Sequence, residues 1–396
     1  MTYCIFCDTV LDEETTPEHV ILSALGGRKT TKRADCSHHN NAFGGGIDKA
    51  IADQVPVIRN LLQLESGAGK APPALRKVRS AAGVINLRSD GTPELAGKPF
   101  VVEELGDGRF DVKIDVNSEE EFARIVPHLA ARMKMPEAEV WRQLSAVKGK
   151  VVSRRPGVTP FKLSFGGEDA VRSIAKSSLV LLATAVGTDP LRDAAFADAR
   201  EFVLTGSGNF NHERASLDPR PIPGAFDLER DYGPLFNLIY VRSDADGRVV
   251  AHFTLYNVIA WQVVLAEANG PKNIKAGLIS DPLNPANWSD RIAESADIDF
   301  AWLNTPDRTE LFPRSTERFN KLLQHYSEVS RAREINRMIE AAMDRERPLG
   351  QPAILSEEQT QRVLAETIDR FAHMTLNVPY EEPFTPTPPK PEPPGD

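Results

Sequence analysis

The chain has 396 residues and a formal net charge of −9, with 41% hydrophobic and 26% charged residues. This length is enough for about two or three domains, and the composition is ordinary for a soluble globular protein. The acidic balance excludes a protein that is basic over its whole surface, although a local basic patch would be enough to bind nucleic acid. No apolar run approaches the ~20 residues that cross a bilayer, and the N-terminus lacks a secretory signal pattern. We therefore expect a cytoplasmic protein with no membrane partner.

The N-terminal part differs in composition from the rest, because it is rich in Cys, His, Gly and Asn and poor in long apolar runs. We expect a small module over residues 1–65, which needs a metal because so short a unit buries little apolar surface. Residues 66–83 then read as a basic linker, in which Lys70, Arg76, Lys77 and Arg79 are unopposed by acids. Either this linker lies on a phosphate backbone, or its charge only keeps it in solution.

Residues 84–378 predict a larger α+β domain of unknown role, with a break between two subdomains near 205–234. Alternating apolar residues predict strands, and apolar residues at helical spacing predict helices. The expected strands are 84–88, 100–104, 110–116, 150–165, 201–204, a hairpin of 235–242 with 248–255, and its extension 258–265. The expected helices are 119–133 with Ser118 as its N-cap, 137–147, 167–200 with a break at Gly187, 315–345, and 356–374 capped by Ser356. Residues 205–234 are expected to form a long loop, 270–312 an irregular segment, and the Pro-rich tail 379–396 a disordered end.

All three cysteines fall in one short stretch, and their spacing predicts a zinc site. Cys4 and Cys7 form a C-x-x-C pair, and Cys36 and His39 form a second pair with the same gap. Each gap lets both side chains of a turn reach one tetrahedral ion, so we expect a structural Zn²⁺ with these four ligands. His38 competes with His39 for the fourth position. A redox pair at Cys4 and Cys7 is disfavoured, because no thioredoxin-like helix follows them.

Four ligands close a zinc site, so any chemistry must come from other residues of the same stretch. Between the two pairs lie Glu18-His19, Gly26-Gly27 and a basic loop, and Asn40-Asn41 follow the second pair. The basic side chains of that loop are expected to contact DNA phosphates, and they are Arg28, Lys29, Lys32 and Arg33. In isolation Glu18-His19 would be an ordinary surface pair, and its position between two zinc half-sites favours a functional role.

The order of these elements resembles the HNH endonuclease family. The matching elements are C-x-x-C, E-H-V-I, L-G-G and C-x-x-H-N-N, followed by F-G and I-D, and they cover only residues 4–50. The second pair ends in His39 where the family usually has a cysteine. The middle asparagine of the family signature is also absent, since Thr30 and Thr31 occupy that region. The resemblance implies a ββα-metal fold for the N-terminal module.

The resemblance also implies a reaction and its residues. His19 is similar to the general base that activates water for attack on phosphorus, and neutral imidazole suits that role. Glu18 and Asn40 resemble the ligands of one catalytic Mg²⁺ or Mn²⁺, with Asn41 as a substitute for Asn40. Asp48 orients a neighbouring group or touches the metal, or it is an ordinary acid at the start of a helix. The expected function is hydrolysis of double-stranded DNA.

The role of the larger domain stays open at this point. It could recognise DNA, sense a ligand or form a homodimer, and bacterial HNH enzymes with appended domains suggest restriction or anti-phage defence by analogy only. A zinc-dependent nucleic-acid-binding module without catalysis is the alternative, since it would need the four zinc ligands and not His19. A third interpretation places the function in residues 84–375 and leaves the N-terminal unit as a structural knuckle.

Overall fold

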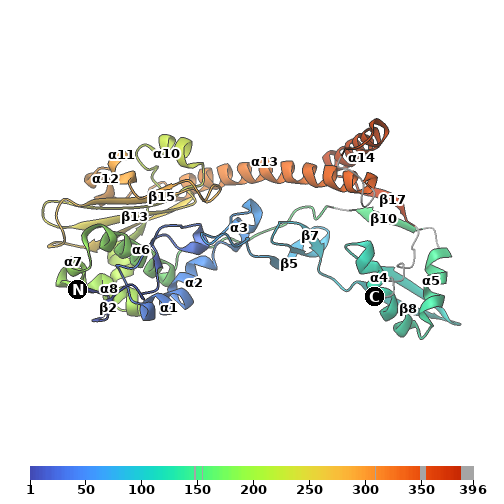
Figure 1. Ribbon diagram of the computed structural model, residues 1–396, viewed down its shortest axis with the longest axis horizontal. Helices are drawn as coiled ribbons and strands as arrows, with labels where there is room; N and C mark the ends of the chain where they lie inside the picture. Colours follow the sequence, from blue (N-terminus) through green and yellow to red (C-terminus); the bar gives the residue numbers. More distant parts are fainter. Residues whose placement is uncertain (147–148, 154, 308, 348–353, 385–396) are drawn as a thin grey trace. The chain divides into compact units, whose positions relative to one another are not determined.

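The computed structural model describes residues 1–146, 149–153, 155–307, 309–347 and 354–384, and its architecture is mixed α+β as predicted (Figure 1). The chain forms two compact units. Met1–Pro73 and Lys162–Glu328 build the first, whereas Ala74–Phe161 and the chain from Val329 onward build the second. Residues 1–65, the predicted N-terminal module, thus lie in the same compact unit as the distant segment Lys162–Glu328. None of the described helices is long and apolar enough to cross a membrane.

The N-terminal part of the first unit consists of short hairpins followed by helices. Its elements are β1 (Thr2–Tyr3), β2 (Val10–Leu11), β3 (Glu18–His19), η1 (Ser23–Leu25), β4 (Thr30–Thr31), α1 (Ser37–Gly45), α2 (Ile47–Ala52) and α3 (Pro56–Leu62). β1 pairs with β2, and β3 pairs antiparallel with β4, so that Glu18 faces Thr31 and His19 faces Thr30. Helix α1 follows the second hairpin directly. Strand, strand and helix thus occur in the ββα order that the resemblance implies.

An antiparallel sheet of six strands, in the order β11-β14-β13-β12-β15-β16, forms the centre of the first unit. Its strands are β11 (Ala215–Leu217), β12 (Asn237–Ser243), β13 (Val249–Leu255), β14 (Ile259–Ala266), β15 (Lys275–Ser280) and β16 (Trp288–Ser289). The expected hairpin at 235–255 and its extension at 258–265 are confirmed as β12, β13 and β14. Nearly every residue of these three strands is buried, because helices cover both faces of the sheet.

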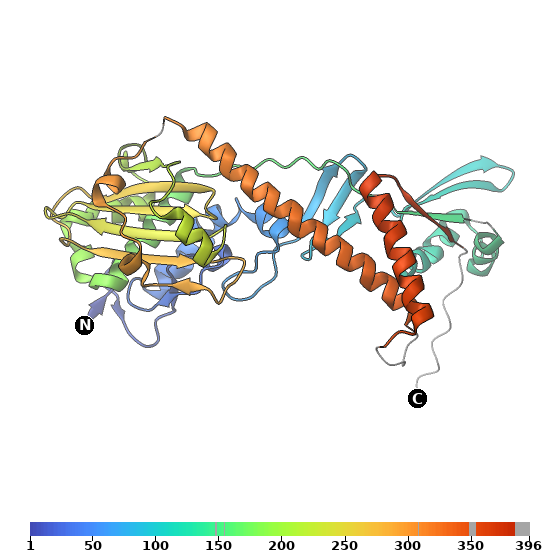
Figure 2. The same ribbon diagram turned by 90° about the horizontal axis from the view of Figure 1, so that it is seen from above.

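Helix α6 (Glu168–Val186) packs against one face of this sheet, and the N-terminal module packs against α6. Figure 2 shows the sheet from its other face. Residues of α6, α2 and the sheet share one hydrophobic core. The opposite face carries a second core. The remaining helices of the unit are α7 (Asp189–Arg192), η2 (Ala194–Phe196), α8 (Ala197–Thr205), α9 (Phe210–Arg214), α10 (Ala225–Tyr232), α11 (Ile292–Ser295) and α12 (Phe300–Asn304). In Figure 1, α10, α11 and α12 lie on the side of the sheet away from α6.

The second unit has small antiparallel sheets and four helices or helix portions. Its strands are β5 (Leu75–Ser80), β6 (Gly83–Leu87), β7 (Pro93–Leu95), β8 (Phe100–Gly106), β9 (Arg109–Ile114), β10 (Gly149–Ser153) and β17 (Tyr380–Phe384). Its helices are α4 (Glu119–Met133), α5 (Glu137–Ala146), the part of α13 (Leu311–Glu346) beyond Glu328, and α14 (Glu357–Leu376). Ser118 caps α4 and Ser356 caps α14, as the sequence predicts. Both hydroxyls accept a backbone N–H that the first turn leaves unpaired.

Several expectations about secondary structure were wrong. Of the expected strand 150–165, the described residues form strand only within β10, Gly149–Ser153. Residues 201–204 belong to helix α8. The buried residues Ala199, Phe202 and Val203 recur at the three- to four-residue spacing of a helix face. The expected loop 205–234 contains α9, β11 and α10, and the expected irregular segment 270–312 contains β15, β16, α11 and α12. The linker 66–83 includes strand β5, paired with β6, and Tyr380–Phe384 of the expected disordered tail pairs with β10. Residues 385–396 of that tail lie outside the described residues.

Candidate functional site

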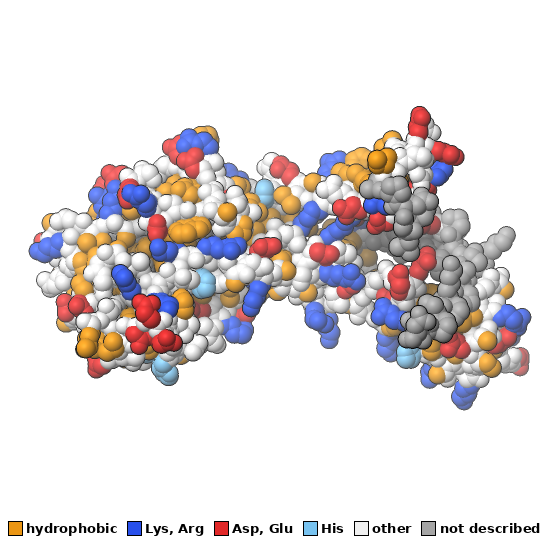
Figure 3. Space-filling view, viewed as in Figure 1, with side chains coloured by type: hydrophobic (Ala, Val, Ile, Leu, Met, Phe, Trp, Pro, Cys, Tyr) orange, Lys and Arg blue, Asp and Glu red, His pale blue; other side chains and the backbone are white. Residues whose placement is uncertain are grey.

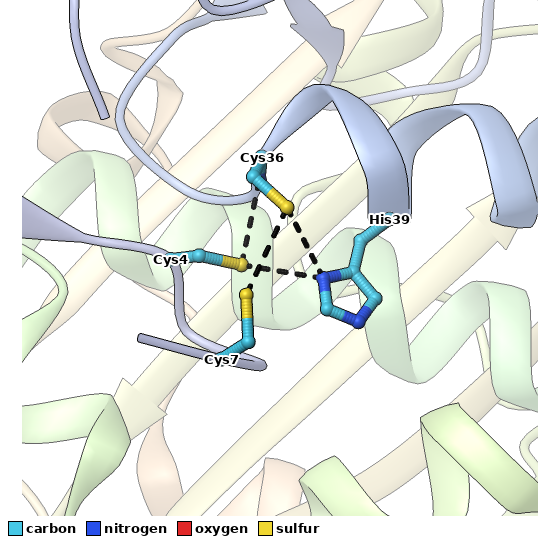
Figure 4. Close-up of side chains that lie close together, drawn as sticks. All are labelled: Cys4, Cys7, Cys36 and His39. Carbon is cyan, nitrogen blue, oxygen red and sulfur yellow. Dashed lines mark hydrogen bonds between the residues drawn. The ribbon is translucent and has the colours of Figure 1, made fainter. Parts of the chain in front are cut away.

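The four predicted zinc ligands lie together (Figure 4). Cys4 and Cys7 lie in the turn between β1 and β2, Cys36 is the N-cap of α1, and His39 is in its first turns. The Cys36 Sγ to His39 Nδ1 distance is 3.3 Å, the Cys4 Sγ to His39 Nδ1 distance is 3.6 Å, and the two sulfurs of Cys7 and Cys36 are 3.8 Å apart. Zinc bonds of ~2.3 Å to sulfur and ~2.0 Å to nitrogen imply tetrahedral edges of about 3.5 to 3.8 Å. The geometry therefore fits a tetrahedral ion.

His39 completes this cluster and His38 does not. The ligand atoms of Cys4, Cys7, Cys36 and His39 all lie within 4.8 Å of one another, and among the described residues this is the one such group of His, Cys, Asp or Glu. The His38 side chain is exposed. Burial lowers the pKa of His39, which keeps its ring neutral and able to bind a metal. Burial also raises the pKa of the Cys4 thiol to about 12, so this thiol needs a cation beside it to ionise.

Neighbouring groups hold the cysteine turn in place. The backbone N–H groups of Phe6 and Cys36 donate to the Cys4 sulfur, both at 3.4 Å. Arg192 of α7 donates to the carbonyl oxygen of Cys4 at 2.6 Å and to that of Cys7. Such donors stabilise a thiolate cluster and fix its orientation. The turn is thus tied to both α1 and α7.

The second group of predicted residues, Glu18, His19 and Asn40, comes from β3 and α1. The Asn40 side-chain amide donates to the backbone carbonyl of Pro17 at 3.1 Å and lies 3.4 Å from that of Thr16. Asn40 is therefore beside the entry to β3, immediately before Glu18 and His19. Asn41, the predicted substitute, is exposed on the next position of the helix. The structure brings His19 and Asn40 into one small region.

Glu18 and His19 point in different directions from the same strand. Glu18 is 4% exposed and His19 is only partly buried, as expected for successive residues whose side chains alternate across a strand. Burial lowers the pKa of His19, and the positive charge of Lys176 adds to this effect. A neutral imidazole that is partly open to solvent can accept a proton from water.

The environment of Glu18 differs from the prediction. Its Oε1 accepts a hydrogen bond from Lys176 Nζ at 2.6 Å, and both groups are buried. Lys176 also donates to Asp48 Oδ2 at 2.7 Å, and the other oxygen of Asp48 accepts from Ser173 at 2.6 Å. Asp48 is thus a buried acid in the first turn of α2, and both of its carboxylate oxygens accept hydrogen bonds from α6. It is the second acceptor of a buried lysine.

Sequence analysis missed Lys176 and Ser173 of α6, and it missed Asp35. Asp35 is 1% exposed, and neither of its carboxylate oxygens has a hydrogen-bond partner. Burial raises its pKa to about 7, and the negative charge of Glu18 adds to the effect. A lysine inside the apolar run of α6 was the available signal, since a buried lysine requires acidic partners.

The basic loop is partly engaged within the first unit. Lys29 forms an ion pair with Asp290 at 2.7 Å, and Lys32 donates to the carbonyl oxygen of Glu13. Nε of Arg28 is buried, whereas Arg33 is exposed. Figure 3 shows acidic and basic side chains intermixed on the visible face, with no single large basic surface. Any phosphate contact in this loop therefore rests on few side chains.

Searches of protein-family models, of curated proteins and of solved structures found no match to this chain.

Proposed function

We propose that this protein is an endonuclease that hydrolyses phosphodiester bonds of DNA, with His19 as the general base. The observation that supports the proposal best is the β3–β4–α1 unit. It presents a partly exposed, neutral histidine on β3, and Asn40 donates to the carbonyl of Pro17 just before that strand. A cluster of four possible metal ligands closes the same unit. The larger part of the chain would serve recognition or regulation, and a role in restriction or anti-phage defence is an extension by analogy.

The residues of the chain divide the work as follows. His19 accepts a proton from the attacking water, and the zinc cluster holds the turn and the start of α1 in position. The HNH resemblance implies one Mg²⁺ or Mn²⁺, which when bound would stabilise negative charge on the phosphate and the leaving oxygen. Of the two predicted ligands for that ion, Asn40 keeps its side-chain oxygen for the role. Glu18 fits poorly, because its carboxylate is buried and bonded to Lys176.

The experiment is cleavage of supercoiled plasmid and of linear duplex in Mg²⁺ or Mn²⁺ by wild-type protein and by His19→Ala. We expect the variant to lose about 100- to 10,000-fold in rate, the usual contribution of a general base. Zinc content and affinity for DNA should stay unchanged. His212→Ala is the matched control, because His212 is exposed on α9, away from this module in sequence, and its loss should leave the rate unchanged.

The result also decides between the proposal and the alternative. A wild-type protein that binds duplex but cleaves neither DNA nor RNA in either metal would favour a zinc-dependent nucleic-acid-binding module without catalysis. Equal cleavage rates for wild type and His19→Ala would remove His19 from the mechanism.

A further inference from the structure

Helix α6 carries a lysine at the centre of an otherwise apolar and small-residue face. Lys176 is fully buried, and so are its neighbours Ala175 and Ser177. A buried ammonium group loses its hydration, and a protein tolerates this only when acids are placed around the charge. The acids come from the N-terminal module, which lies about 130 to 160 positions earlier in the chain. This arrangement ties the module to the sheet through one charged group.

The contacts around Lys176 join both elements that carry the proposed active site. Glu18 belongs to β3, the strand of His19, and Asp48 belongs to α2, which packs against the Asn40 helix α1. Burial by itself would lower the pKa of Lys176, but Asp48 and Glu18 outweigh this effect and raise it. The ammonium therefore stays charged, and its two hydrogen bonds of 2.6 and 2.7 Å are charge-assisted.

The geometry of a strand transmits this constraint to His19. Successive side chains of a strand point to opposite faces, so a Glu18 that is held inward directs its neighbour His19 outward. β3 has only two residues and pairs with the two residues of β4, and one further backbone bond, from Val20 to Lys29, extends the hairpin. So short a hairpin is marginal by itself. The Glu18–Lys176 bond is therefore a main constraint on the direction of the His19 ring.

We propose that Lys176 is a positioning residue for His19 and that it acts by holding Glu18. On this proposal Glu18 fixes strand β3 to α6 and is not a ligand of a catalytic ion. The inference rests on the proposed function for its kinetic test. It departs from the HNH resemblance, which assigns Glu18 to the metal.

The test compares Lys176→Met, Glu18→Gln and the double variant in DNA cleavage, with Mn²⁺ titrated at each step. We expect Lys176→Met to lower kcat by about 100-fold, the usual cost of a displaced catalytic group, with little change in KM. Glu18→Gln should lower kcat less, because an amide oxygen still accepts from Lys176, and the Mn²⁺ concentration for half-maximal rate should stay unchanged. The double variant should be no slower than Lys176→Met, since both changes break one contact.

Arg220→Met is the matched control, because Arg220 is also a mostly buried cation bonded to a buried carboxylate, Asp218. Its partners Asp218 and Trp302 belong to the other face of the sheet, so kcat should stay near the wild-type value. If Lys176→Met fails to fold, a triple variant takes its place in the test. It combines Lys176→Met with Glu18→Gln and Asp48→Asn, so that neither acid is left as an unpaired buried charge. The triple variant should fold, keep its zinc and show the same loss of kcat.

Two outcomes would overturn the inference. One is a Glu18→Gln protein that needs at least about tenfold more Mn²⁺ while Lys176→Met keeps its kcat, which is the result for a metal ligand. The other is an unchanged His19 ring signal in ¹⁵N-histidine NMR spectra of folded Lys176→Met. This second readout needs no activity, so it judges the position of His19 even if wild-type protein cleaves nothing and the proposed function fails.

Discussion

Two clusters fasten the N-terminal module, and they differ in how far apart in the chain their members lie. Cys36 and His39 are three positions apart, whereas Lys176 and Glu18 are 158 positions apart. A metal cluster built from near neighbours leaves its ligands visible as a spacing in the sequence. A buried ion pair between distant segments leaves only an anomaly, here a lysine within an apolar helix.

The two clusters also differ in how they stabilise the fold. A structural zinc ion supplies binding free energy that a small module cannot obtain from its core. A buried ion pair contributes little net stability, because removing both charges from water offsets their attraction. The loss of one partner is nevertheless costly, since the remaining charge stays buried. We therefore expect the loss of a metal ligand to destabilise the fold more than the loss of one partner of the buried ion pair.

The largest effect is expected when the metal cluster loses a thiolate. Cys36→Ser should release the zinc ion and unfold the module, because about 10–16 kcal/mol of binding free energy is available to hold such sites together. Zinc analysis and limited proteolysis of the purified protein measure both consequences. His38→Ala is the control, and it should keep its zinc because His38 is exposed and outside the cluster. Full zinc occupancy in Cys36→Ser would show that these four residues do not form the site.

Lys176→Met should have the second largest effect on stability. It leaves Glu18 and Asp48 buried without their cation, and the free energy of unfolding should fall by about 3–5 kcal/mol. Urea denaturation measures the change. Adding Glu18→Gln and Asp48→Asn should restore most of the loss, because no unpaired charge then remains. A triple variant as unstable as Lys176→Met would mean that packing, and not charge, sets the cost.

The pKa of a third buried group, His252, shifts in the direction opposite to that of Lys176, because burial outweighs its acidic neighbour. His252 is fully buried near Asp218, Arg220, Arg318 and Thr254, and burial lowers its pKa to about 4 despite the attraction of Asp218. The unfolded chain takes up a proton below its usual pKa of about 6.5, and the folded protein does so only below about 4. Stability should therefore fall as the pH drops from about 6.5 to about 4, by about 3 kcal/mol in total.

His252→Gln tests this dependence, because glutamine does not titrate. The difference in unfolding free energy between wild type and variant should change by about 3 kcal/mol across that pH range, whereas titrations common to both proteins cancel. Urea titrations at several pH values give the two curves. Parallel curves of unfolding free energy against pH for wild type and variant would show that folding does not lower the pKa of His252.

The sequence predicted those parts that depend on short-range pattern. The cluster of four possible metal ligands, the caps Ser118 and Ser356, and the hairpin of β12 and β13 follow from spacing, local hydrogen bonds and alternation. Short elements were missed, because α9, β11, α11 and α12 have too few residues to show a period. Their structure depends on packing against the sheet. The partners of Glu18 and Asp48 could not be predicted, since nothing near them in the chain specifies α6.

The smallest effects are expected for an ion pair at the surface that joins residues even farther apart in the chain. Lys29 and Asp290 are 261 positions apart, and their side chains are 29% and 39% exposed. Lys29→Ala should change the unfolding free energy by less than about 1 kcal/mol, because water screens the pair. Separation in the chain would then decide whether an ion pair can be predicted from the sequence, and burial would decide how much it contributes to the unfolding free energy.

The same pair tests which basic side chains reach DNA under the proposed function. Arg33→Ala should lower the slope of log affinity against log salt by about 1, since one phosphate contact is lost. Lys29→Ala should change that slope less, because Asp290 already neutralises Lys29, and Asp290→Asn should raise affinity by freeing it. Fluorescence anisotropy with a labelled duplex over a range of salt concentrations measures all three. If Lys29→Ala lowers the slope as much as Arg33→Ala, Lys29 exchanges Asp290 for a DNA phosphate on binding. The surface ion pair would then break when DNA binds, whereas the buried pairs of Lys176 stay intact.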